Sequence, residues 1–239
     1  YNNLYVNTPY TPYLIPTNTQ LLNSSEDSTI YIGSAEVLQL PPRPLKNSDI
    51  AYGGTEFWKA RVSTEFGTVY VDNVSKRVFL LTDNLQDISQ FGMRNFWQKN
   101  ADFHFLKQFK LAQGTDYGKY CLASPNAIGY AVTYDPRHKR VLIHKRDYKI
   151  KAEYETSFTV TDVDNPIISE NTLWYDGVNY YYNVSASVQS LIDFGDPAFF
   201  ENKSFTISYS FLNNQWSSYH SYLPYYMFND ADSFYSGDV

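Results

Sequence analysis

Two stretches of the sequence share one pattern and decide the fold: Gly67-Thr-Val-Tyr-Val-Asp-Asn-Val-Ser-Lys-Arg-Val-Phe-Leu-Leu81 and Gly129-Tyr-Ala-Val-Thr-Tyr-Asp-Pro-Arg-His-Lys-Arg-Val-Leu-Ile-His144. Each begins with glycine, runs through β-branched and aromatic residues to an aspartate, and continues with Lys-Arg-Val. An aspartate at the start of a turn can accept hydrogen bonds from the backbone of that turn. The pattern therefore predicts a β-hairpin with a four-residue turn, used twice.

A third, looser copy follows near the end of the chain. Ser204 to Phe211 and Gln215 to His220 are β-type runs joined by Leu212-Asn-Asn214. The turn aspartates of the first two copies are 63 residues apart (135 − 72), more than the roughly 40 to 50 residues of common propeller blades. We expect a mainly β fold of antiparallel hairpins forming propeller-like blades, as a partial β-propeller or a sandwich, with an insertion between two blades.

The insertion is predicted to be helical over about residues 85–112. Apolar residues recur there at spacings of three and four, which is typical of amphipathic helices; they are Leu85, Ile88, Met93, Phe96, Trp97, Phe103, Leu106 and Phe109. Ahead of the β-rich domain, assigned to residues 29–239, the proline-bearing residues 1–28 predict an extended N-terminal arm. A short strand is expected at Thr29 to Gly33.

Composition supports the β assignment and excludes several classes of protein. Tyr, Phe and Trp number 23, 16 and 4, while charged residues make up only 18% of the chain, which favours pleated, half-buried surfaces. The net charge of −6 argues against a protein that coats nucleic acid as a whole. No apolar run approaches the roughly 18 residues of a membrane-spanning helix, so we expect no membrane insertion. The first residue is Tyr1 rather than Met, and we expect a processed product or part of something longer.

Catalytic motifs are scarce in this sequence. The four histidines fall in no HExxH or His-x-His pattern, and no nucleophile elbow or phosphate-binding loop occurs. Glu153 and Glu155 lie two apart on a predicted strand and so on one face, an arrangement from which a glycosidase could draw an acid and a base. A solvated strand edge explains the same pair. We expect no enzyme activity, no cofactor and no metal site.

Interface candidates come from two features. Arg137 to Lys151 carries seven cations against one anion, Asp147, and a basic hairpin on an acidic chain suits an acidic patch of another subunit. Tyrosines cluster at 180–182 and in 219–228, and tyrosine supplies rigid contact area at protein interfaces. The candidates are Arg137, Lys139, Arg140, Lys145, Arg146, Tyr180, Tyr181, Tyr182, Tyr222, Tyr225 and Tyr226.

Several segments, in one order along the chain, resemble the large muzzle-type tail proteins of crAss-like bacteriophages. They are Tyr52-Gly-Gly-Thr55, Thr64 to Asp72, Val78-Phe-Leu, Ile88 to Met93, Tyr134-Asp-Pro-Arg137, and Ser204-Phe-Thr-Ile-Ser-Tyr-Ser with Gln215-Trp-Ser-Ser-Tyr-His-Ser-Tyr-Leu-Pro224. The resemblance implies a non-enzymatic virion structural protein located in the phage tail, in the assembly that closes or surrounds the DNA exit channel. Its implied partners are further copies of itself and other phage tail proteins.

Two other functions stay open at this point. A carbohydrate-binding or glycan-degrading β-propeller of a surface or secreted protein would use the tyrosines to stack on sugars, with Glu153 and Glu155 as its first catalytic candidates. The basic hairpin could instead make transient contact with genomic DNA, in which case the affinity would fall steeply with salt.

Overall fold

The computed structural model describes residues 3–8, 10–16, 20–23, 29–32, 41–45, 53–55, 57, 59–82, 84–105, 128–155, 157, 159–160, 169–176, 179–185, 188–230 and 232–237. The chain is mainly β, built from several antiparallel sheets, as predicted. The strands of the first half are β1 Asn3–Asn7, β2 Pro12–Pro16, β3 Gln20–Asn23, β4 Thr29–Ile32, β5 Arg43–Pro44, β6 Arg61–Thr64, β7 Gly67–Asp72, β8 Arg77–Leu81 and β9 Leu85–Asp87. Those of the second half are β10 Gly129–Asp135, β11 Arg140–Arg146, β12 Tyr148–Ile150, β13 Thr159–Val160, β14 Thr172–Tyr175, β15 Tyr180–Ser185, β16 Val188–Ile192, β17 Phe200–Asn202, β18 Phe205–Ser210, β19 Gln215–His220, β20 Tyr226–Asp230 and β21 Ser233–Gly237.

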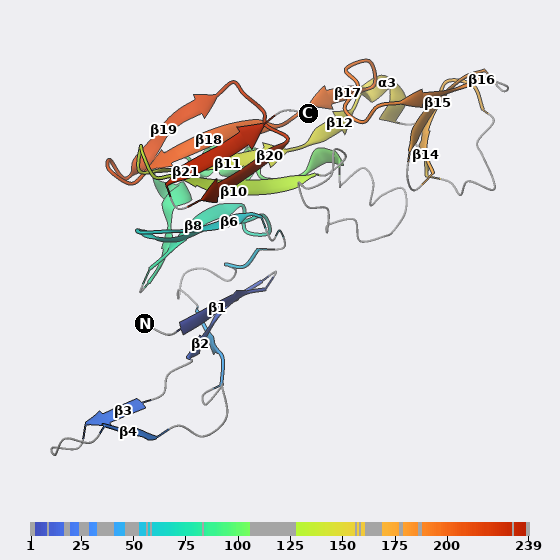
Figure 1. Ribbon diagram of the computed structural model, residues 1–239. Coiled ribbons are helices and arrows are strands. Elements are labelled where there is room, and N and C mark those ends of the chain that lie inside the picture. Colours follow the sequence, from blue (N-terminus) through green and yellow to red (C-terminus); the bar gives the residue numbers. More distant parts are fainter. Residues whose placement is uncertain are drawn as a thin grey trace.

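Two four-stranded antiparallel sheets form the centre of the molecule (Figure 1). The first, in the order β6-β7-β8-β9, follows the chain as a simple meander. The second has the order β10-β11-β18-β19, so its two hairpins are separated in sequence by an insertion that contains β12 to β17. Each sheet has the strand number and connectivity of a blade, which agrees with the predicted partial propeller or sandwich.

The three predicted hairpins are all present and have the same turn length. Asp72 pairs with Arg77, Asp135 with Arg140 and Ser210 with Gln215, which leaves four residues in each turn. The last turn residue has a positive φ in every case: 58° at Lys76, 48° at Lys139 and 50° at Asn214.

The turn aspartates act as expected. Asp72 Oδ1 accepts from the backbone N–H of Val74 at 2.8 Å and of Ser75 at 3.0 Å, and Asp135 Oδ1 accepts from that of His138 at 3.2 Å. These bonds lie within the turn itself, so they favour the chain reversal independently of tertiary contacts.

The two central sheets pack face to face through one core. Alternate residues of the first sheet point into it, among them Val69, Val71, Val78 and Leu80. The second sheet contributes Tyr130, Val132, Tyr134, Val141, Ile143, Phe205, Ile207 and Tyr209. This period of two places one side of every hairpin strand in the core.

Smaller hairpins cover the outer faces of this pair of sheets. On one side, Leu45, which follows β5, packs against Tyr70 and Phe79 of the first sheet. On the other side, Met227 of β20 packs against Ala131 and Leu142 of the second sheet. The result is a stack of layers in which β1-β2-β5 lies beyond the first sheet and β20-β21 packs against the second (Figure 1).

The predicted N-terminal arm contains paired strands. β1 pairs with β2 over five residues, and β3 pairs with β4 over four. The short strand expected from Thr29 is β4. Pro12 and Pro16 lie at the two ends of β2, and Thr8 Oγ1 donates to the Thr11 carbonyl at 2.8 Å to close the turn. Prolines at strand ends do not prevent a hairpin.

The helical insertion is shorter than predicted. Leu85 to Asp87 are strand β9 rather than helix, because they pair with β8 and complete the first sheet. A 3-10 turn, η1, follows at Ile88–Gln90 and is capped by the Asp87 side chain, and helix α1 spans Arg94–Asn100. Ala101 to Phe103 are not helical, and residues 106–112, the end of the predicted insertion, lie outside the described residues.

The segment between β11 and β18 extends away from the two central sheets (Figure 1). It holds the two-stranded ribbon β12-β17, the short helix α3 at Ala152–Glu155 and a sheet of order β13-β14-β15-β16. An aromatic cluster joins it to the body of the molecule. In this cluster the ring of Phe194 lies 5.1 Å from Phe105, 4.9 Å from Tyr148 and 5.4 Å from Tyr180, measured between centroids.

We expect Gly67→Ala to destabilise the first hairpin by about 2 kcal/mol or more. Gly67 has a φ of 128°, and a Cβ at this position would lie 2.5 Å from the Leu81 carbonyl oxygen. Gly92→Ala is the matched control, because Gly92 also has a positive φ (77°) but a Cβ there would meet nothing within 4 Å. Urea unfolding of both variants checks this, and equal losses would contradict the close approach at Gly67.

Candidate functional site

The predicted basic hairpin does not present a continuous positive surface. Lys145 and Arg146 are buried, with 1% and 3% of their surface exposed. They lie on β11, whose side chains point alternately to the two sides of the second sheet, and both sides are covered by other elements. The exposed cations are therefore confined to the turn and its flanks. Arg137 is fully on the surface, and Lys139 and Arg140 are half-buried.

Carboxylates neutralise most of these cations. Lys139 pairs with Glu65, Arg140 Nε lies 2.9 Å from Asp135 Oδ2, and Lys145 Nζ lies 2.9 Å from Asp147 Oδ2. The side-chain hydrogen bond from Lys139 lowers the pKa of the Glu65 carboxyl, which keeps that partner charged. This arrangement weakens the case for nucleic-acid binding, which needs cations available to phosphates.

The tyrosines at 180–182 pack inside the insertion. The Tyr180 ring is buried against Phe194 and Phe200. Tyr181 stacks on Trp174, its cross-strand neighbour, with centroids 4.5 Å apart. Tyr182 is half-buried against Tyr154 and Phe199. Core packing therefore accounts for most of this cluster.

The three C-terminal tyrosine candidates differ in how exposed their side chains are. Arg146 lies over the Tyr225 ring, 4.2 Å from its centroid, and the backbone carbonyl of Tyr222 accepts a hydrogen bond from Thr206. Tyr226, in contrast, is 44% exposed. Two residues outside the candidate set join it on the same hairpin: Phe228 is 54% exposed and Tyr235 is 48% exposed.

We call Tyr226, Phe228 and Tyr235 the outer aromatic surface. Phe228 and Tyr235 are directly opposite on β20 and β21, and their rings are stacked, 5.0 Å apart at 19°. Tyr226 follows in the same row, 6.2 Å from Phe228 at 22°. The sequence signal was the alternation of aromatic residues at 226 and 228, which places both on one side of a strand. The position of Tyr235 beside them could not be predicted, because it depends on the pairing register of β20 and β21.

A cleft of about 400 Å³ adjoins this surface. Lys59 and Arg61 line one side, and Tyr226, Phe228 and Asn229 line the other. Val132 and Met227, both buried, complete the lining. We call this the β20 cleft. It combines two cations, two aromatic rings and an amide, a mixture typical of recognition sites.

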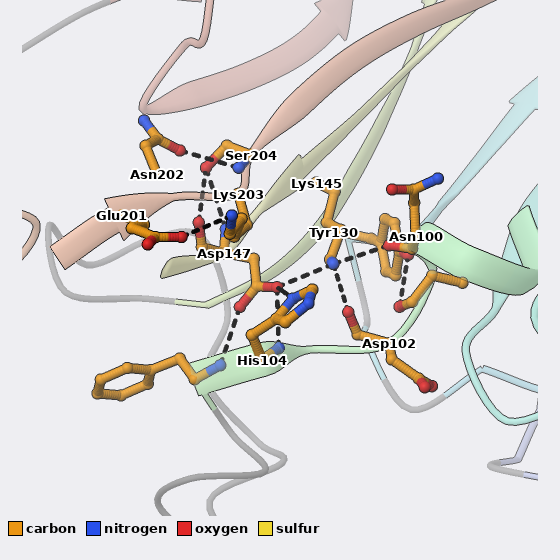
Figure 2. Close-up of polar contacts among 12 residues, drawn as sticks. Asn100, Asp102, His104, Tyr130, Lys145, Asp147, Glu201, Asn202, Lys203 and Ser204 are labelled. Atoms are coloured by element: carbon orange, nitrogen blue, oxygen red, sulfur yellow. Dashed lines mark hydrogen bonds and ion pairs between the residues drawn. The ribbon is translucent and has the colours of Figure 1, made fainter. Parts of the chain in front are cut away.

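The densest polar cluster is buried beside α1 and is shown in Figure 2. Lys145 Nζ donates to the carbonyl of Asn100 at 2.8 Å and to that of Asp102, and it pairs with Asp147 Oδ2. The Asp147 carboxylate also accepts from the backbone N–H of His104 at 2.9 Å and of Phe105 at 3.2 Å. The cluster thus ties the end of α1 and the following residues to β11.

The chemistry of this cluster is structural. An ammonium has three protons, and those of Lys145 point at three oxygens, so no lone pair is free for nucleophilic or base chemistry. Glu153 and Glu155 do not form the predicted strand pair, because Ala152–Glu155 is a helix and residues two apart on a helix do not face each other. In the described ranges, no group of three or more His, Cys, Asp or Glu side chains is arranged to hold a metal ion. Within the same residues, no helix has the length and apolar character needed to span a bilayer.

A buried histidine predicts a dependence of stability on pH. His144 Nδ1 lies 2.9 Å from Thr206 Oγ1, which itself donates to the Tyr222 carbonyl at 2.8 Å, so the imidazole donates to the hydroxyl. Burial, and next the charge of Arg146, lowers the pKa of His144 from 6.5 to about 4. The folded pKa is below the unfolded one, so this stability is complete above pH 6.5 and is lost as the pH falls toward 4.

We expect the free energy of unfolding to fall by about 2 kcal/mol between pH 7 and pH 5, from His144 alone. His144→Gln keeps a donor for Thr206 but cannot titrate, and it should flatten the profile in this range. An unchanged profile in His144→Gln would contradict the assignment.

Comparisons with known proteins add nothing to this geometry. No protein-family model matches the chain, and no curated protein matches it significantly.

Proposed function

We propose that this chain is a non-enzymatic structural protein of a tailed-bacteriophage virion, part of the tail or muzzle assembly around the DNA exit channel. The proposal rests on the sequence resemblance together with one structural observation. That observation is the outer aromatic surface, which lies on the last layer of the stack with Phe228 54% exposed.

The physical reason is the cost of leaving such side chains in water. Full burial of a Phe or Leu side chain contributes roughly 1.5–3 kcal/mol, and a row of three exposed aromatic residues is typical of a surface that a partner covers. Other exposed apolar residues occur at strand edges, including Leu4 at 51% and Leu191 at 65%. A subunit that assembles with copies of itself and with other tail proteins would bury these residues.

Glycan binding is less well supported. Sugars stack on the flat faces of aromatic rings, but Phe228 and Tyr235 lie 5.0 Å apart and nearly parallel, so each covers a face of the other. In the insertion, Trp174 and Tyr181 do the same at 4.5 Å.

Peptide mapping of purified particles by mass spectrometry tests the proposal. We expect peptides covering Tyr219 to Phe228 in a band of the particle proteins, at a constant ratio to the capsid protein across a density gradient. Absence of these peptides from washed particles would remove the virion function. Specific retention of the purified chain on a glycan would then favour the carbohydrate-binding alternative.

A further inference from the structure

Arg61 gives the β20 cleft a positive charge. The cleft lining contains no Asp or Glu. Arg61 is exposed and forms no ion pair with the residues that the structure describes. The chain as a whole has a net charge of −6, so this cleft is a local exception that suits a negatively charged occupant.

The cleft also borders an open strand edge. Among the described strands, β20 pairs only with β21, which leaves the backbone groups of its other edge unpaired. Met227, Phe228 and Asn229 of this strand line the cleft. An unpaired edge beside a cleft is suited to the addition of an extended segment, which supplies main-chain hydrogen bonds along the strand. This favours a polypeptide as the occupant.

Within the described strands, the sheet in the insertion has an unpaired edge strand without any charged residue. Strand β16 is the last strand of the sheet β13-β14-β15-β16 and pairs only with β15 in the described part of the chain. It contains no charged residue, and Val188 and Leu191 are 51% and 65% exposed. Natural proteins commonly protect such an edge with lysine, proline or a covering loop; β16 has neither of these residues.

A carboxylate follows directly after β16. Asp193 is exposed and makes no ion pair with the described residues. β16 and β20 are both five residues long. The two strands therefore match in length, and Asp193 at one end of β16 is opposite in charge to Arg61 beside β20.

One molecule cannot bring its own two edges together. β16 lies at the far end of the insertion, well away from β20 (Figure 1). Each edge thus remains open in a single copy, and a second copy can satisfy both. Such a contact joins two different surfaces, so it is heterologous and produces a closed ring or an open filament rather than an isolated twofold dimer.

We propose that the β16 edge of one copy adds to β20 in the cleft of a second copy, with Asp193 paired to Arg61 and Leu191 packed beside the outer aromatic surface. This interface deepens the oligomeric part of the proposed function and rests on it. The occupant is a segment of the same chain.

Sedimentation velocity of the purified chain over a range of concentrations tests the interface. We expect concentration-dependent association. Arg61→Glu and Asp193→Arg should each raise the apparent dissociation constant by about 30-fold or more, because each puts like charges together. The double variant Arg61→Glu/Asp193→Arg restores opposite charges and should recover most of the association. A 1:1 mixture of the two single variants should also associate.

Matched controls separate this pairing from a general charge effect. Arg43→Glu and Glu170→Arg reverse exposed charges outside both edges and should leave association unchanged. Leu191→Ser should weaken association without altering the charge.

Three results would each overturn the interface: a chain that stays monomeric, single charge reversals that do not weaken association, or a double variant that does not recover it. Absence of the chain from particles removes the virion function but does not alter these measurements, so the two failures can be told apart.

Discussion

Replacing Lys145 with Met is expected to cost about 3–5 kcal/mol of stability, since it leaves the Asp147 carboxylate buried without its counter-charge. Both side chains are essentially inaccessible, at 1% and 0% exposed. The variant also removes the donor that the carbonyls of Asn100 and Asp102 share (Figure 2). Urea unfolding monitored by tryptophan fluorescence measures the loss.

Lys76→Met is the matched control for this prediction. Lys76 also pairs with Asp102, at 2.8 Å, but both side chains are 29% exposed. An exposed pair contributes about 0–1 kcal/mol, so this variant should remain close to the parent. In Lys145→Met/Asp147→Asn the buried charge is gone, and part of the stability should return. Similar losses for Lys145→Met and Lys76→Met would show that the buried cluster does not anchor the helical segment.

Trp97→Ala is expected to be the other large loss, about 3–5 kcal/mol. Trp97 is fully buried and fastens α1 to the second sheet: its ring centroid lies 5.4 Å from Trp216, 5.9 Å from Phe205 and 6.4 Å from Tyr130. Removing the side chain leaves a cavity between a helix and a sheet that are also held together by Lys145, so the site has little freedom to collapse. Thermal and urea unfolding measure the effect.

Two further variants define the origin of this loss. The Trp97 indole N–H has no hydrogen-bond partner among the described residues, so Trp97→Phe loses volume but no hydrogen bond and should cost clearly less than Trp97→Ala. Phe91→Ala removes an aromatic ring that is 40% exposed and should change stability by less than about 1 kcal/mol. A loss in Phe91→Ala as large as in Trp97→Ala would contradict the anchoring role.

Local signals were sufficient for the hairpins of the fold. Asp72 and Asp135 each fix a turn through hydrogen bonds within four residues, so the sequence alone predicted both hairpins. Leu85 to Asp87 show where such reasoning fails. Their apolar spacing continues into α1, but pairing with β8 completes a sheet, and this tertiary contact outweighs the local helical pattern.

The candidate surface was predictable only in part. Tyr226, one of the clustered tyrosines, is exposed in the structure, but the composition could not distinguish it from Tyr180, which is 5% exposed. The difference lies in which layer each strand belongs to. Lys145 shows the same limit for charge: in sequence it belongs to a basic run, while in the structure strand alternation buries it against α1.

Hydroxyl-radical footprinting of the free chain and of intact particles shows whether assembly buries the outer aromatic surface, because it reports the exposure of aromatic and leucine side chains in both states. We expect Phe228, Tyr235 and Leu191 to be oxidised in the free chain and strongly protected in particles. Phe91, an exposed residue outside both edges, should react equally in the two. Equal oxidation of Phe228 and Leu191 in the free chain and in particles would contradict an assembly that buries these edges.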